Sequence, residues 1–258
     1  MNQQKSKITA DTWLIEADTW PGANPEQIAN RMDYVLLVFA QCFGSEILQE
    51  KNVNLVNSTV GPPRTCPKRL NPKQGIEYMV ILQNPGGFSP QFYFQAAHGF
   101  SHVFMDCYPE SKFIEWLPEC LCAAASFYVL KRLSFMIQTE KELLSNYLVT
   151  LTSEAEQKKS KWGSLSKYYA AHKNEFANDP YNRSKNDVVG LWFLEIIEKN
   201  PRGWKCIAQM NDTSIKTKTW ASTHEATKVF CRQWRDRCKI KEEKRFVVDL
   251  LKALGIKL

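Results

Sequence analysis

The sequence predicts an α+β protein, in which a small twisted sheet packs on a helix and a mostly helical half follows. Two observations lead to this prediction. Val53–Ser58 alternates apolar and polar residues, and Ile76–Gln83 is rich in β-forming side chains, so both segments are predicted strands. From about Phe113 onward, apolar residues recur at helical spacing almost to the end of the chain. Strands therefore come early and helices dominate the rest, which is an α+β pattern.

Length and composition fit a packed globular protein. The chain has 258 residues, 44% of them apolar, with eight Trp, which suffices for one domain or for two small lobes around a cleft. No signal peptide is recognised at the N-terminus, and no window approaches the roughly 20 apolar residues of a membrane span. None of the eight Cys forms a CxxC pair. Reduced thiols and a cytoplasmic location are therefore expected.

The net charge of +7 is concentrated near the C-terminal end. Residues 216–258 contain twelve Lys/Arg and five Asp/Glu. The simplest interpretation is a solvated helix face, and a surface for nucleic acid or for an acidic partner is the alternative. No nucleic-acid-binding motif accompanies the charge, so nucleic acid is not an expected partner.

The first half of the chain is expected to begin with a loosely tied arm, residues 1–24. A helix then starts at Pro25, with Asn24 as its N-cap and a buried stripe along one face. Between the two predicted strands, Gly-Pro-Pro and Asn-Pro turn signals bracket an irregular loop. Together with the helix described next, these elements make up an α/β half, residues 25–112.

Ser89-Pro90 offers an N-cap and a first-turn proline for a helix that should stop near Tyr108-Pro109. A second helix begins around Phe113 to Pro118 and is apolar nearly all the way round, so we expect it to be buried. It opens a helical half, residues 113–258. Further helices are predicted over residues 140–158, 165–176, 185–199, 201–210, 224–238 and 241–254.

His98 and His102 are the candidates for a metal site. A helix turns about 100° per residue, so side chains four positions apart project from one face. Two imidazoles at this spacing can reach one zinc ion. Glu119 follows seventeen residues after His102, near the start of the second helix, and could supply an oxygen ligand. Taken singly, each feature has a plain structural explanation: half-buried histidines, or an acid that complements a helix N-terminus.

A strand, an HxxxH helix and a W-L-x-E helix follow one another in this part of the chain. In this order of elements, the segment resembles the gluzincin superfamily of zinc metallopeptidases. The resemblance covers about Val53–Leu133 and is faint beyond it. The Gly-Pro-Pro loop is also similar to that of small, uncharacterised bacterial proteins of this type. The resemblance implies a zinc ion held by His98, His102 and Glu119, and a peptide or protein ligand in the cleft.

The sequence departs from this family at Gly99, which stands where the catalytic Glu of HExxH is expected. Loss of a positioned general base typically costs about 10²–10⁴ in rate, but it leaves the metal ligands intact. Gly in a helix interior also costs about 1 kcal/mol relative to Ala. Either catalysis has been abandoned, or something comes close to the backbone at Gly99. The first hypothesis is therefore a metallopeptidase-like protein with impaired or absent proteolysis, a pseudoenzyme in the limiting case.

Other assignments stay open. Glu115 or Asp106 could act as a substitute base or contact a histidine ligand. His172 and Tyr181 are available as transition-state donors, but no motif selects either of them.

A nucleophilic cysteine, Cys120 or Cys122, is conceivable, although free Cys in an apolar helix is usually a small core residue. The second hypothesis, from another class, is a non-catalytic binding or scaffold protein that uses the basic C-terminal helices.

Overall fold

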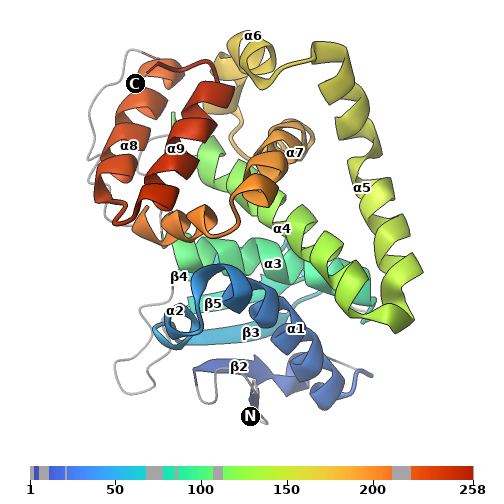
Figure 1. Cartoon of the computed structure of the whole chain (residues 1–258). Coiled ribbons are helices and arrows are strands. Elements are labelled where there is room, and N and C mark those ends of the chain that lie inside the picture. Colours follow the sequence, from blue (N-terminus) through green and yellow to red (C-terminus); the bar gives the residue numbers. More distant parts are fainter. Residues whose placement is uncertain are drawn as a thin grey trace. The chain divides into compact units, whose positions relative to one another are not determined.

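The fold is described from a computed structural model of the chain (Figure 1), and its α+β class agrees with the prediction. The structure describes residues 3–5, 12–20, 22–67, 78–84, 87–106, 113–210 and 222–257. The chain divides into two compact units. The first comprises Met1–Phe104 and Val129–Tyr147, and the second comprises Met105–Tyr128 and Leu148–Leu258.

The first unit contains a five-stranded mixed sheet with the order β1-β2-β3-β5-β4. Strands β2, β3 and β5 run parallel to one another, and β1 and β4 are antiparallel edge strands. The strands span Gln3–Lys5 (β1), Trp13–Glu16 (β2), Val53–Asn57 (β3), Arg64–Pro67 (β4) and Tyr78–Leu82 (β5).

Three of these strands correct the predictions, and the first is β1, which lies in the expected arm. The loosely tied arm expected up to residue 24 contains β2, whose Trp13 is fully buried and donates from Nε1 to Leu48 O at 2.8 Å. The loop expected to be irregular contains β4. Its Pro67 fits an edge strand, where a missing backbone N–H can face away from the neighbouring strand. Strands β2 and β4 are four residues long and β1 is three, too short to show an alternating pattern.

Helix α1 (Pro25–Phe43) begins as predicted, because the Asn24 side chain accepts from Glu26 N at 2.9 Å. The apolar pattern continues beyond Phe43, but the helix does not. Gly44 has a φ of 87°, a left-handed conformation that ends the helix. A short helix, α2 (Glu46–Gln49), follows it.

Helix α3 (Ser89–Met105) starts at the residue expected to be its N-cap. Instead of capping the helix, Ser89 Oγ donates to Glu140 Oε2 at 2.6 Å. The helix ends at Met105, and Asp106 follows with a φ of 42°. The predicted end near Tyr108-Pro109 lies outside the described residues.

One face of the sheet carries the core of the first unit. Helix α3 packs on it, with the Phe100 ring 4.6 Å from the ring of Trp13. Helix α1 joins this core through Phe39, whose ring lies 4.9 Å from that of Phe104. In register along the middle of the same face lie three fully buried side chains, Ile15, Leu55 and Val80.

The second unit is built from helices. Helix α4, apolar all round, is buried over most of its length, as predicted. The segment predicted as a helix over residues 201–210 is a 3₁₀-helix, η3. Helices α8 and α9 pack through Trp234 and Phe246, whose rings lie 6.5 Å apart. The helices not yet bounded are η1 (Ala17–Thr19), α4 (Trp116–Met136), η2 (Gln138–Glu140), α5 (Lys141–Trp162), α6 (Leu165–Asn178), α7 (Arg183–Lys199), η3 (Gly203–Gln209), α8 (Thr223–Arg237) and α9 (Lys241–Ala253).

Within the described parts of the chain, no single helix combines the length and the apolar character needed to cross a membrane. Only the bent pair of α4 and the η2–α5 segment passes that test, when the two are taken together.

Candidate metal-binding site

His98 and His102 lie on one half-buried face of α3. Their ring centroids are 5.1 Å apart, with the ring planes at 62° to each other. Residues between them on the other faces, such as Phe100, are fully buried. The predicted placement of both imidazoles on one helix face is therefore confirmed.

Two glutamines fix how α3 is rotated on the sheet. Gln95 Oε1 accepts from Gln83 N at 2.8 Å, and its Nε2 donates to Gln83 O at 3.1 Å. Gln91 Nε2 donates to the same carbonyl at 3.0 Å. Both glutamines share a helix face with His98 and His102, because the positions follow one another at about one-turn spacing. These hydrogen bonds at the end of β5 fix the rotation of α3 about its axis, and in this orientation the two histidines are half-buried.

Gly99 lies directly against the sheet. A Cβ added at this position would be 2.5 Å from Val80 Cγ1 and 3.2 Å from Thr65 Oγ1. The Thr65 hydroxyl also donates to Gly99 O at 3.2 Å. Of the two explanations for this glycine, a close approach of another segment is confirmed. A Glu here, as in HExxH, would require α3 or β5 to move.

The beginning of α4 brings acidic side chains together with a phenol. Burial raises the pKa of Glu115, a hydrogen bond from the Tyr181 side chain lowers it, and the Glu119 charge raises it again. The pKa of Tyr181 is likewise raised, by burial and by both carboxylates. Sequence reasoning found both glutamates but not their association with Tyr181, because residue 181 precedes α7, far along the chain.

Glu119, the predicted third ligand, is half-buried in the first turn of α4. It belongs to the second unit, whereas His98 and His102 belong to the first. The set of His98, His102 and Glu119 therefore stays a prediction.

Cys120 and Cys122 are fully buried in α4. Burial, followed by the nearby Glu119 charge, raises the pKa of both thiols well above the usual value. Cys120 Sγ donates to Asn186 Oδ1 at 3.4 Å. A buried neutral thiol is a poor nucleophile, so neither residue suits nucleophilic catalysis. Burial does not exclude a thiolate that forms when a metal ion binds, because Cys is a common zinc ligand.

His172, one of the two donors that no motif selected, takes part in helix packing. Its Nδ1 lies 3.0 Å from Glu175 Oε1, and its ring lies 4.5 Å from that of Tyr168. Lys185 Nζ lies 2.9 Å from Glu175 Oε2. These contacts join α6 to the first turn of α7, so they explain His172 without a catalytic role.

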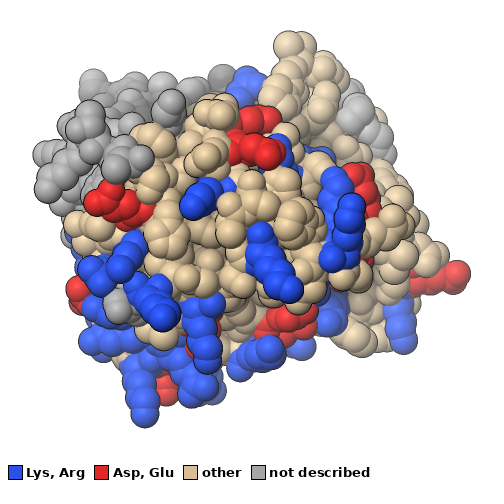
Figure 2. Space-filling view, turned by 90° about the horizontal axis from the view of Figure 1, so that it is seen from above, with Lys and Arg blue, Asp and Glu red and all other residues tan. Residues whose placement is uncertain are grey.

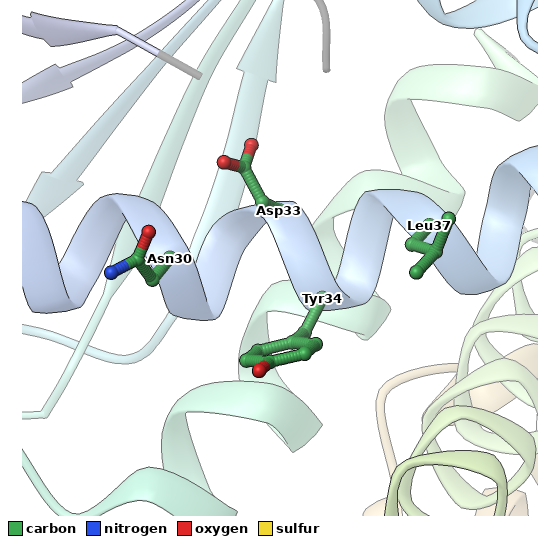
Figure 3. A pocket seen from close by; sticks show the side chains of 4 residues that line it. All are labelled: Asn30, Asp33, Tyr34 and Leu37. Atoms are coloured by element: carbon green, nitrogen blue, oxygen red, sulfur yellow. The ribbon is translucent and has the colours of Figure 1, made fainter. Parts of the chain in front are cut away.

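A shallow hollow of about 400 Å³ runs along α1. Figure 3 shows that its lining side chains come at about one-turn spacing from a single helix: Asn30, Asp33, Tyr34 and Leu37. None of them is a His or a Cys, and one helix face does not surround a ligand. The hollow therefore offers no site comparable with the histidine pair.

Asp187, in α7, makes the stability of the fold depend on pH. Burial raises the pKa of its carboxyl from 3.8 to about 6; the Arg183 charge acts in the opposite direction, and Glu154 raises the value further. The folded state therefore favours the protonated carboxyl. The contribution of the protonated Asp187 carboxyl to the unfolding free energy is present in full below about pH 4 and is lost as the pH rises through about 6.

We expect Asp187→Asn, which stays neutral, to remove this loss. Relative to the original protein, the variant should gain about 1–3 kcal/mol of unfolding free energy between pH 4 and pH 7.5, measured by urea denaturation. Asp249→Asn is a matched control. Arg183 Nε lies 3.7 Å from Asp187 Oδ2 and Arg245 Nε lies 3.7 Å from Asp249 Oδ2, but the Asp249 side chain is 39% exposed against 15% for Asp187. An equal change in both variants would contradict the effect of burial.

Comparison with known proteins does not place the chain in a family: no family model, no curated protein and no solved structure matches it. Function must therefore be argued from the residues themselves.

Proposed function

We propose that this chain is a zinc metallopeptidase-like protein that binds metal but has lost all or most of its peptide hydrolysis. The main support is the pair of imidazoles on one face of α3, with ring centroids 5.1 Å apart. The residue between them in the motif, Gly99, packs against Val80 and Thr65. The donor atoms for a metal are thus kept, while the position of the general base holds no side chain.

The third ligand is proposed to come from α4, where two side chains three positions apart offer different donors. Glu119 follows the gluzincin pattern and offers oxygen. Cys122 offers sulfur, and like Glu119 it belongs to the second unit. Imidazole and thiolate together favour Zn²⁺ over Mg²⁺ or Ca²⁺. Because thiolate is among the usual ligands of zinc, we propose Cys122 as the third ligand, with Glu119 as the alternative.

Zinc bound at this position would supply a Lewis acid or a structural cross-link. Without a carboxylate at position 99, the candidate bases are Glu115 and Asp106, and we favour Glu115 because its raised pKa suits it to proton transfer. A peptide or protein segment is the proposed ligand. If Glu115 does not act, the site holds metal and ligand without turnover.

Titration with Co²⁺ tests metal binding and identifies the third ligand. Cobalt replaces zinc in most tetrahedral sites, and a Cys ligand produces an intense near-ultraviolet charge-transfer band that a carboxylate does not. We expect the original protein to bind Co²⁺ with this band. Cys122→Ser should lose the band, whereas Cys120→Ser, an equally buried neighbour on the same helix, should retain it.

The contrary results are equally clear. Binding without the band, abolished by Glu119→Gln, would make Glu119 the third ligand. Absence of any cobalt spectrum would remove the metal-binding proposal.

A second candidate function is a non-catalytic binding or scaffold protein. It is supported by the same missing side chain at Gly99 and by the basic residues of α8 and α9. The two functions are compatible, because neither requires proteolysis.

A further inference from the structure

Basic side chains form rows on the outer faces of α8 and α9. On α8, Lys228 and Arg232 lie about one turn apart, and Lys239 follows just after the helix; Arg232 and Lys239 are exposed. On α9 the exposed row consists of Lys241, Arg245 and Lys252. Figure 2 shows Lys and Arg gathered at the lower left of the face in view, over these two helices.

A third segment brings more positive charge to the beginning of α9. Asn200 Nδ2 donates to Glu242 O at 2.9 Å, which holds the turn between α7 and η3 against α9. Two cations, Arg202 and Lys205, follow in that turn and in η3. We call the resulting group the basic end; it consists of Arg202, Lys205, Lys239, Lys241 and Lys244.

Among the residues that the structure describes, no ion pair offsets the charge of the basic end. Within the described residues, none of its five side chains forms one. Glu243, in the same stretch, is only 4% exposed and accepts from Lys239 N at 2.8 Å. Its carboxylate therefore caps α9 and is not available at the surface. Glu242 is the one exposed acid between Lys239 and Lys244.

The described surface of α8 and α9 has few apolar side chains, and this limits the kinds of molecule that it could bind. Ile240, 47% exposed, is the one large apolar side chain exposed on described α8, α9 and the turn between them, whereas Trp234 and Phe246 are buried. The core of a protein–protein interface needs several apolar or aromatic anchors, and a helix lying on a membrane needs an apolar face. Binding to a phosphate backbone needs only spaced cations.

We propose that the basic end binds the phosphate backbone of a nucleic acid without reading its base sequence. Exposed aromatic side chains that could stack on bases are missing from described α8 and α9. The proposal does not depend on the metal site, and a zinc-free protein would be expected to bind in the same way.

Fluorescence anisotropy with a short labelled DNA duplex, and with an RNA of the same sequence, tests the proposal. We expect binding that weakens steeply as salt is raised. In Lys241→Glu/Lys244→Glu, affinity at low salt should fall by about tenfold or more, and the logarithmic salt slope should become shallower by about two. Both substitutions lie near the N-terminus of α9, where Glu is favourable to the helix dipole, so the fold should persist; circular dichroism checks this.

Lys141→Glu/Lys161→Glu is the matched control, because both lysines are exposed on α5 and the net charge changes equally. It should leave the affinity within about twofold of the original. Three outcomes would overturn the proposal: no binding at low salt, equal losses in the two double variants, or binding to anionic phosphatidylserine vesicles but not to nucleic acid.

Discussion

Gly99→Ala is expected to destabilise the protein by about 1–3 kcal/mol, although Ala normally stabilises a helix by about 1 kcal/mol relative to Gly. The reason is the 2.5 Å separation between an added Cβ and Val80 Cγ1. Val80 is fully buried in the central part of the sheet and cannot rotate into free space. Urea denaturation of the two proteins gives the difference in unfolding free energy directly.

Val80→Ala provides the control, because it removes the methyl group at 2.5 Å and leaves Val80 Cβ at 3.7 Å and Thr65 Oγ1 at 3.2 Å from the added Cβ. The single variant should itself cost about 2 kcal/mol through the cavity it creates. In that background, Gly99→Ala should become neutral or stabilising, which gives a coupling energy of about 2 kcal/mol. If Gly99→Ala has the same effect in both backgrounds, steric contact with Val80 is not the reason for the glycine.

The same contact governs attempts to restore a general base. Gly99→Glu would add a longer, charged side chain to the position that already lacks room for a methyl group. In the original background we expect loss of stability and no gain of hydrolysis. The combination of Val80→Ala with Gly99→Glu is the variant in which a gain of hydrolysis is worth measuring.

The second large effect concerns metal and stability. A metal that binds only the folded state stabilises it by about 4 kcal/mol at a free concentration of 1,000 times its dissociation constant. We expect the melting temperature to rise when Zn²⁺ is added to chelator-treated protein. The rise should be absent in His98→Ala/His102→Ala, since a helix with neither imidazole keeps no ligand pair.

Calcium or magnesium at the same concentration should not reproduce this rise, because both cations prefer oxygen ligands. A rise of equal size with all three metals would indicate non-specific binding to surface carboxylates.

The α3 helix shows what could be predicted from sequence. Its start near Ser89-Pro90 agrees with the structure to within a residue. His98 and His102 lie on one helix face, as their spacing predicts. The buried character of α4 also follows from its own apolar residues. Local periodicity and capping thus carry information over a few turns of chain.

What could not be predicted involves partners distant in sequence. The side chain that excludes a Cβ at Gly99 is Val80, on a strand nineteen residues earlier, and the second contact is Thr65, on a strand too short to recognise. Likewise, Tyr181 meets Glu115 and Asn200 meets Glu242 at 2.9 Å only because helices pack. Such contacts are set by tertiary structure, and no single segment encodes them.

The zinc content of the purified protein tests the metal-binding claim most directly, and the four histidines of the chain supply their own control. After exposure to Zn²⁺ and desalting, elemental analysis should find about one zinc per chain in the original protein and in His172→Ala/His224→Ala, and none in His98→Ala/His102→Ala. A zinc-free original protein, or equal zinc in the two double variants, would contradict a metal site at His98 and His102.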